Sequence, residues 1–246
     1  MKQLVCISSM PDTAAKISFT ADQTHFNKEG VQYIMNPYDE WYALVRAVEM
    51  KEEHGGTITV CHVGTANNDT IIRKALAIGA DEAVRVNKDP QDGYDVAVQI
   101  ANVARDQEFD IIYTGKESID YNAASVGAML AELLDLPFIS YANHMTYAHG
   151  KASVTREIEG GDEIVALPSP FILSASKGLA EQRIPNMRGI MMAKRKPLNV
   201  VEPVAVSQMA RIVKYSTPPP REACEMIDPE DMDALVRKLA EEAKVI

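Results

Sequence analysis

Short apolar runs alternate with amphipathic stretches along the first half of the chain. The period of the apolar residues predicts strands at 2–7, 57–63, 82–86 and 109–114, and helices at 39–53, 67–78, 95–105 and 122–134. Strands that alternate with helices of this length form βαβ units and a parallel sheet. Ligands of such sheets bind beyond the carboxyl ends of the strands. The loops after Ile7, Val63 and Thr114 are therefore expected to surround one crevice.

The pattern departs from this alternation in three places. Residues 15–20 and 31–35 predict a β-hairpin excursion, and residues 151–158 and 163–167 flank Glu159-Gly160-Gly161-Asp162, a typical hairpin turn, before a strand at 171–175. Residues 199–225 show no clear period, and the three prolines at 218–220 favour an extended conformation. We therefore divide the chain into an α/β domain at 1–198 and a C-terminal arm and helix at 199–246.

The last helix has a clear start signal. Asp228 can cap it and Pro229 suits its first position. Apolar residues then share one face: Met232, Leu235, Val236, Leu239 and Ala240. Such a helix, following an extended arm, either docks on its own domain or clasps a partner, and the sequence leaves both alternatives open.

Charge and composition exclude several classes of protein. The 246 residues carry a formal net charge of -10, which argues against nucleic-acid binding and against an anionic membrane as the main partner. The three cysteines include no CxxC pair and favour a reducing compartment. Neither a leader pattern nor an apolar run of membrane-spanning length is seen, so we expect a cytoplasmic protein that is not inserted into a membrane.

Motifs of catalysis are missing from the sequence. It contains no GxGxxG or GxxxxGK[ST] phosphate-binding turn, no GxSxG elbow and no HExxH metal site. His62 ends a predicted strand and is expected to be packed and hydrogen-bonded more readily than to bind a ligand. A βαβ sheet without catalytic residues or metal ligands fits a binding or carrier role, so we expect no enzymatic activity from this chain alone.

Five segments stand out when the sequence is taken as a whole: MNPYDE at 35–40, RKALAIGAD at 73–81, the loop at 119–127, REIEGG at 156–161 and IMMAKRKPL at 190–198. All five resemble segments of one family, the beta subunits of electron-transfer flavoproteins. The segments occur in the family's order and spacing, and the resemblance covers essentially the whole chain. It implies a Rossmann-like α/β fold of the adenine-nucleotide hydrolase type.

The resemblance also implies a function and its cofactors. The chain would be the beta subunit of a heterodimer, bind a structural AMP and help to hold the FAD of the alpha subunit. Electrons would pass from flavin dehydrogenases, such as the acyl-CoA dehydrogenases of fatty acid oxidation, to a quinone reductase.

Transferred residue by residue, the resemblance implies a nucleotide site on three strand ends. Asn36 and Asp39 would approach the adenosine, and the phosphate would lie on the loop at 120–127, where amides at the start of a helix suit an anion. The full set of implied site residues is Cys6, Asn36, Asp39, Val63, Gly64, Asp120, Asn122, Ala123, Ala124, Ser125, Val126 and Gly127.

The phosphate loop leaves the identity of the nucleotide open. It has Ala124-Ser125-Val126-Gly127 where many AMP-binding members have Asn-Gln-Thr-Gly. The Val-Gly pair resembles the electron-bifurcating branch, in which a second FAD replaces AMP and NADH also binds, but that branch's Gly-Asp-Thr is here Tyr121-Asn122-Ala123. We expect AMP, because a phosphate held by the backbone needs few side chains.

Residues 180–192 resemble the family's recognition loop, which docks partner dehydrogenases. Met187 stands where the family has an anchoring leucine, and a flexible methionine suits an adaptable interface. Basic residues nearby could steer an acidic partner. The implied contact residues are Ile184, Met187, Arg188, Ile190 and Met191. The sequence just before the loop, at 175–184, departs from the family's DLRLNxPRY.

Two alternative functions remain open at this point. One is the bifurcating beta subunit described above. The other is a stand-alone adenine-nucleotide-binding regulator of the universal-stress type, which shares the fold. The arm and helix after residue 199 argue against that regulator, because a compact protein of this kind needs neither.

Overall fold

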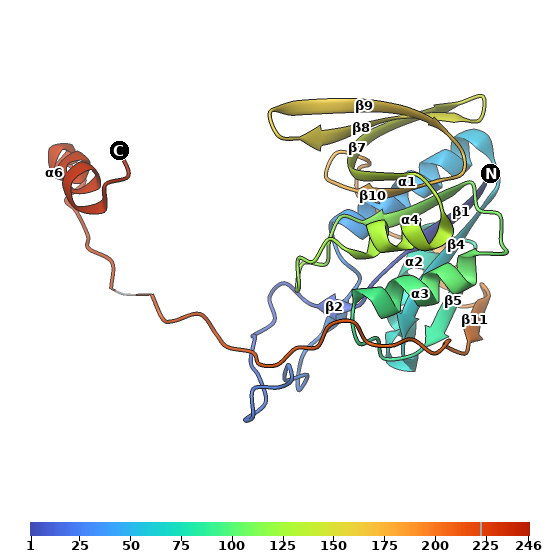
Figure 1. Cartoon of the computed structure of the whole chain (residues 1–246), viewed down its shortest axis with the longest axis horizontal. Helices are drawn as coiled ribbons and strands as arrows, with labels where there is room; N and C mark the ends of the chain where they lie inside the picture. The colour runs from blue at the N-terminus through green and yellow to red at the C-terminus, as the bar shows by residue number, and fades with distance from the viewer. Residues whose placement is uncertain (222) are drawn as a thin grey trace. The chain divides into compact units, whose positions relative to one another are not determined.

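The computed structural model describes residues 1–221 and 223–246, which fall into two compact units. The first unit comprises residues 1–17 and 27–213, and the second comprises 18–26 and 214–246. The first unit contains a nine-stranded sheet with helices on both faces (Figure 1). The predicted α/β fold with a largely parallel sheet is therefore confirmed.

The sheet has the strand order β11-β5-β4-β1-β6-β10-β7-β8-β9. The pairs between β11 and β7 are parallel, whereas β7-β8 and β8-β9 are antiparallel. The strands are β1 (Lys2–Cys6), β4 (Thr57–Gly64), β5 (Glu82–Asn87), β6 (Ile111–Gly115), β7 (Phe138–Ala148), β8 (Lys151–Ile158), β9 (Gly161–Pro168), β10 (Phe171–Ala175) and β11 (Leu198–Val201). The strand order reverses between β1 and β6, which makes their carboxyl ends the topological switch point.

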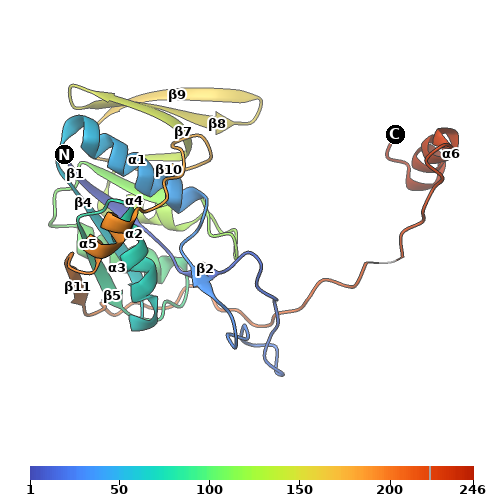
Figure 2. The same ribbon diagram turned by 180° about the vertical axis from the view of Figure 1, so that it is seen from behind.

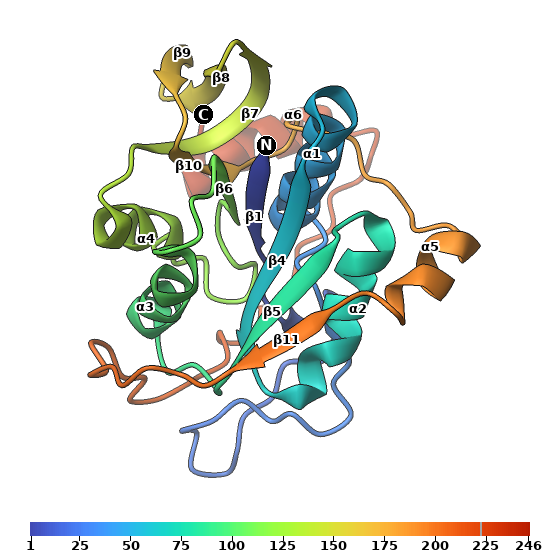
Figure 3. The same cartoon turned by 90° about the vertical axis from the view of Figure 1, so that its right-hand side faces the viewer.

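Two helices cover each face of the parallel part. Viewed along the sheet in Figure 3, α1 (Asp39–His54) and α2 (Asp69–Ile78) lie on one side, and α3 (Gly93–Ala104) and α4 (Val126–Leu134) lie on the other. The apolar stripes of α1 and α2 join one buried cluster with Val5, Val60 and Tyr113. Those of α3 and α4 join a second cluster with Leu4, Cys61 and Ile112. Alternate residues of β1 thus serve opposite faces, as the pleat requires.

Four details of the predicted elements are corrected. The hairpin pairs β2 (Met10–Pro11) with β3 (Tyr33–Ile34), and residues 15–20 form no strand. The 67–78 helix is split into a 3-10 turn, η1 (Ala66–Asn68), and α2. The helix predicted from 122 begins only at Val126, because Asn122 and Ala124 have left-handed φ angles of 51° and 49°. Residues 199–201, which showed no period, belong to the edge strand β11.

The second unit contains a short helical end without a core of its own. α6 (Met232–Arg237) continues as one π-helical stretch, η2 (Lys238–Ala243). Its N-cap is Asp231, whose carboxylate accepts a hydrogen bond from the amide of Ala234, whereas the carboxylate of the predicted cap Asp228 accepts from the turn amide of Glu230. None of the described residues of this unit is buried. Phe19 and Tyr215 stack with ring centroids 4.8 Å apart, which joins its two chain segments.

Among the described residues, no helix combines the length and the apolar character that a membrane span requires.

Candidate nucleotide site and docking segment

The carboxyl ends of β1, β4 and β6 lie at one edge of the sheet. Their register pairs Cys6 with Cys61 and Val5 with Tyr113, so the loops that follow these strands start side by side. The strand pairing therefore brings the three loops to the same edge of the sheet, as the sequence analysis predicted.

The side chains of Asn36 and Asp39 connect the 36–39 turn to the loop after β6. Asn36 Nδ2 donates to the carbonyl oxygen of Glu117 at 2.9 Å, and its Oδ1 accepts from the amide of Tyr38 at 3.0 Å. Asp39 Oδ2 accepts from the amide of Glu117 at 3.3 Å. Burial raises the pKa of the Asp39 carboxyl, partly offset by that amide and by Lys116. Asn36 and Asp39, the two residues predicted to approach the adenosine, are thus held in place by hydrogen bonds to the backbone of Glu117. The sequence analysis did not select Glu117.

The side chains of Cys6 and Val63 are not available for contact with a nucleotide. Both are buried, and both belong to the apolar cluster under α3 and α4. Burial raises the pKa of the Cys6 thiol well above its ordinary value, and the neighbouring Cys61 and Glu40 raise it further. A ligand at these strand ends would therefore meet their backbone and not their side chains.

Gly64 lies beneath the side chains of two polar residues. A Cβ at this position would come within 2.3 Å of His62 Nε2 and 2.6 Å of Asn68 Oδ1. His62 is buried, with Nδ1 2.8 Å from the carbonyl oxygen of Ile7, and burial lowers its pKa. This neutral imidazole therefore joins the ends of β1 and β4, in agreement with the packed histidine expected from the sequence.

Arg85 on β5 binds the backbone carbonyl of Gly64, the last residue of β4. Its Nη1 donates to the Gly64 oxygen at 2.9 Å, and its Nε lies 2.8 Å from Asp69 Oδ1 at the start of α2. Arg85 is only 4% exposed, yet the sequence analysis did not select it. A charged residue inside a predicted buried strand is the signal that could have identified it.

The 120–125 loop presents unpaired main-chain amides. Asn122 and Ala124 are left-handed and Ser125 is right-handed, an alternation that turns successive amides toward one side and is typical of anion-binding nests. The amides of Ala123, Ala124 and Ser125 form no hydrogen bond with any residue that the structure describes. Asp120 to Ala124 are exposed. The loop can therefore offer several N–H donors to a phosphate at the amino end of α4.

The remaining loop residues have structural roles. Val126 begins α4, and Gly127 is buried where a Cβ would come within 2.9 Å of Thr114 Oγ1 and of the Phe138 ring. Gly127 thus lets α4 approach the ends of β6 and β7. Asp120 uses its carboxylate to accept from the amide of Tyr121 at 3.0 Å.

The predicted recognition loop at 180–192 and the residues up to Lys196, called the docking segment below, contain a short exposed helix, α5 (Met187–Ala193), which the sequence analysis did not predict. Asn186 caps it by accepting from the amide of Gly189 at 2.8 Å. Figure 2 shows α5 beside α2. Ile184 is 88% exposed, Met187 74% and Met191 67%, whereas Ile190 is 42% exposed. Together with exposed Arg188, these residues form an apolar surface with a basic rim.

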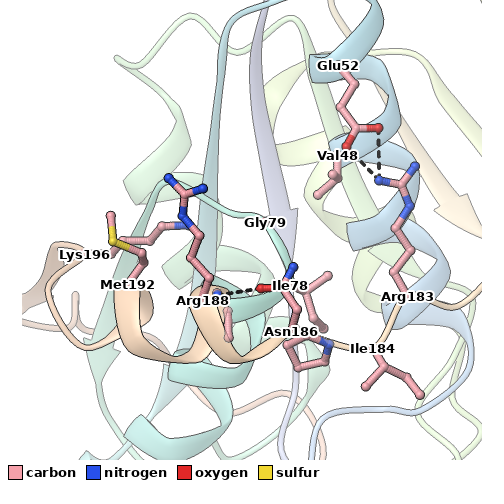
Figure 4. Close-up of a pocket in the computed structure, with 13 residues that line it drawn as sticks. Val48, Glu52, Ile78, Gly79, Arg183, Ile184, Asn186, Arg188, Met192 and Lys196 are labelled. Carbon is pink, nitrogen blue, oxygen red and sulfur yellow. Dashed lines mark hydrogen bonds and ion pairs between the residues drawn. The ribbon is translucent and has the colours of Figure 1, made fainter.

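Both ends of the docking segment are anchored to the domain. On one side, Arg183 donates to Glu52 Oε1 at 2.8 Å, and Trp41 Nε1 donates to the Arg183 carbonyl at 3.2 Å. On the other, Arg73 Nη1 donates to the carbonyls of Ala193 and Lys196 at 2.8 and 2.6 Å. Between these anchors lies an open cavity of about 450 Å³, lined by α1, the end of α2 and the segment itself (Figure 4).

Comparisons with known proteins identify the family of the chain. A profile of the electron transfer flavoprotein domain matches residues 23–206. The electron transfer flavoprotein subunit beta of Bacillus subtilis is 35% identical over 260 residues, with both chains covered completely. The chain belongs to the electron transfer flavoprotein family, as a beta subunit.

The human electron transfer flavoprotein subunit beta is 31% identical over 255 residues, covering 100% of this chain and 99% of its own. Protein FixA of Azotobacter vinelandii is 30% identical over 265 residues, covering 99% of this chain and 93% of its own. Electron transfer flavoprotein beta subunits are electron carriers, whose complexes contain flavin and an alpha subunit. The family predicted from five short segments is thus confirmed over the full chain.

Proposed function

We propose that this electron transfer flavoprotein subunit binds AMP as a structural nucleotide and pairs with an alpha subunit to hold one redox-active FAD. The complex accepts electrons from flavin dehydrogenases, such as acyl-CoA dehydrogenases, and passes them to a quinone reductase in the cytoplasm. The chain itself contributes scaffold, part of the wall around the FAD and a docking surface.

The observation that carries the nucleotide proposal is the set of free amides at Ala123, Ala124 and Ser125. A phosphate bound there needs no basic side chain, because N–H groups and the amino end of α4 supply the positive potential. The neighbouring backbone of Cys6, Val63 and Gly64 would meet the nucleoside, with Asn36 and Asp39 holding the 36–39 turn in place. AMP supplies such a site with a phosphate and a base, and it takes no part in electron transfer.

When bound, the FAD supplies the one- and two-electron chemistry, while the protein excludes water and orients the partners. The exposed surface of Ile184, Met187, Arg188, Ile190 and Met191 is the proposed contact for a dehydrogenase. Apolar side chains centred on Met187 would supply contact area, and Arg188 would steer an acidic partner.

The alpha subunit is the proposed partner of the second unit. A helix of this length is marginal in water without packing. The exposed apolar residues of the unit include Met226, Met232, Val236, Val245 and Ile246. Of the two alternatives left open by the sequence, we propose the clasping of a partner.

A bifurcating complex is the second candidate, because Val126-Gly127 resembles that branch. Extraction of nucleotides from the complex co-expressed with its alpha subunit distinguishes the two. One AMP and one FAD in a yellow 1:1 heterodimer are expected from the first proposal, whereas two FAD per heterodimer would establish the second. A colourless chain that never associates with an alpha subunit would contradict both.

A further inference from the structure

Glu40 links the first turn of α1 to the loop after β1. Its side chain is 7% exposed, and Oε2 accepts a hydrogen bond from the amide of Ser8 at 2.7 Å. Ser8 is the second residue beyond β1, so this bond fixes the direction in which the chain leaves the strand. The neighbouring Ser9 Oγ is also buried and has no hydrogen-bond partner among the described residues.

The end of β6 is shaped to admit the Glu40 side chain. Gly115 is the last residue of β6, and a Cβ there would lie 2.9 Å from Glu40 Cγ. Glu40 thus occupies the space between the carboxyl ends of β1 and β6, where the strand order reverses. This is the position at which open α/β sheets bind their ligands.

The environment of Glu40 supplies little compensation for a negative charge. Within the described chain, no Lys, Arg or His forms an ion pair with it. Its titratable neighbours are Asp39 on α1 and Cys6 on β1, while Lys116 and Glu117 beyond β6 act on Asp39. Burial raises the pKa of Glu40 to about 7, although the Ser8 and Asn36 contacts oppose this. An uncompensated buried carboxyl weakens a fold, and such groups cluster at functional sites.

We propose that Glu40 is a positioning residue of the nucleotide site, whose carboxylate holds the Ser8 amide and thereby the 8–9 loop in the conformation that receives the nucleotide. This inference rests on the proposed nucleotide function. A charged acceptor holds an amide more strongly than a neutral one. The nucleotide affinity of this chain therefore decreases as Glu40 takes up a proton, between about pH 8 and pH 6.

The test compares Glu40→Gln with the unmodified full-length chain, by calorimetric titration of the nucleotide-free proteins with AMP at pH 6, 7 and 8. Glutamine keeps the shape and an acceptor oxygen for Ser8 but loses the charge. Glu53→Gln, an exposed position on the same helix, is the matched control. Because the phosphate of AMP titrates in the same range, the readout is the difference between the slopes of the variant and of wild type.

From pH 8 to pH 6, the AMP affinity of wild type and of Glu53→Gln should fall by a factor about five times larger than that of Glu40→Gln. This factor corresponds to the difference between a charged and a neutral hydrogen bond. At pH 8 the Glu40→Gln variant should bind AMP about fivefold more weakly, yet unfold at a higher temperature, because the buried charge is gone. If Glu40 affected only the stability of the fold, Glu40→Gln would raise the unfolding temperature without weakening AMP binding.

Two outcomes would overturn the inference, and they are distinguishable. If Glu40→Gln binds AMP as tightly as wild type at pH 8 with the same pH slope, Glu40 does not position the loop, and the nucleotide function stands. If neither protein binds AMP at any pH, the proposed AMP function itself fails, and the role of Glu40 in the AMP site fails with it.

Discussion

The side-chain amide of Gln99 holds the backbone of Val204 from both sides: Nε2 donates to the Val204 oxygen at 2.8 Å, and Oε1 accepts from the Val204 amide at 2.9 Å. Gln99 is a buried residue of α3. Further along, Asp92 Oδ2 accepts from the amides of Met209 and Ala210 at 2.7 and 2.9 Å. The chain after β11 is thus attached to α3 at two points before the second unit begins.

Replacing Gln99 should therefore release this segment. Gln99→Met keeps the length of the side chain but removes both hydrogen bonds to the half-buried backbone of Val204, at a cost of about 1–3 kcal/mol. We expect faster amide hydrogen exchange across 202–210, while β1 and β4 stay protected. Asn102→Ala, an exposed position on the same helix, is the control and should change neither. Unchanged exchange at 202–210 in Gln99→Met would show that the bonds hold nothing in place.

Half-buried Gly189 should resist substitution more than an exposed glycine such as Gly161. A Cβ there would lie 2.4 Å from the carbonyl oxygen of Ala77, a backbone atom that cannot move alone. Gly189→Ala should displace α5 from α2 and lower the unfolding free energy by about 1–3 kcal/mol. At Gly161, where the space around a Cβ is open, alanine should be tolerated. Urea unfolding of both variants checks this, and equal stabilities would contradict the described packing of α5.

Met187 should affect docking without affecting folding. It is 74% exposed, so Met187→Ala should leave the unfolding temperature unchanged, whereas loss of an interface anchor should lower the rate of reduction by an acyl-CoA dehydrogenase at least tenfold at limiting dehydrogenase concentration, a loss of about 1.4 kcal/mol or more. The control is Ile164→Ala on β9, which is 71% exposed and lies outside the segment. Stopped-flow flavin absorbance of the heterodimer measures the rates. Equal rates for both variants would remove Met187 from the interface.

The stability of the first unit should depend on pH through Glu40. An unfolded glutamate gives up its proton near pH 4.5, whereas the folded one keeps it to about pH 7. Between these values the folded state binds more protons, so the Glu40 contribution to stability decreases as pH rises, by about 3 kcal/mol in total. Urea unfolding at pH 5 and pH 8 should show this decrease in wild type and much less of it in Glu40→Gln. Parallel pH profiles for the two proteins would contradict it.

Removal of residues 214–246 should separate folding from assembly. The first unit keeps both of its buried clusters without them, so the truncated chain should retain its circular dichroism and unfolding transition. Association with the alpha subunit should decrease strongly, because the exposed apolar helix is lost. Size-exclusion chromatography of the co-expressed pair measures the outcome. A truncated chain that still forms a stable heterodimer would place the alpha contact elsewhere.

Five of the parallel strands (β1, β4, β5, β6 and β10) and the four main helices could be predicted because their apolar periods are regular. The strand β7 was missed, because a proline precedes it, polar Asn143 and His144 interrupt its pattern, and the pairing shifts register between Ala142 and His144. The partner strand of the hairpin was missed because Met10–Pro11 is very short and contains a proline. These elements owe their existence to neighbours in the sheet and not to local preference.

The candidate site, like the fold, has parts that the sequence could predict and parts that it could not. The strand ends and the 120–127 loop could be located by topology and resemblance, although the contacts of this chain with a nucleotide stay predictions. The left-handed Ala124 could not be foreseen, because alanine rarely adopts that conformation. Glu40 and Arg85 were missed because an acidic first turn is typical of helices, and because a single arginine in a strand does not reveal what it bonds.

The exposed end of the chain has a consequence for how the two subunits are produced. A copy made in excess of its proposed alpha partner would present the exposed backbone at 211–214, ahead of the prolines, where proteolytic nicking is favoured. Cleavage there would remove the last helix while the folded remainder persists, and such a remnant could no longer compete for newly made partners. The ratio of the two subunits would then correct itself without a dedicated regulator.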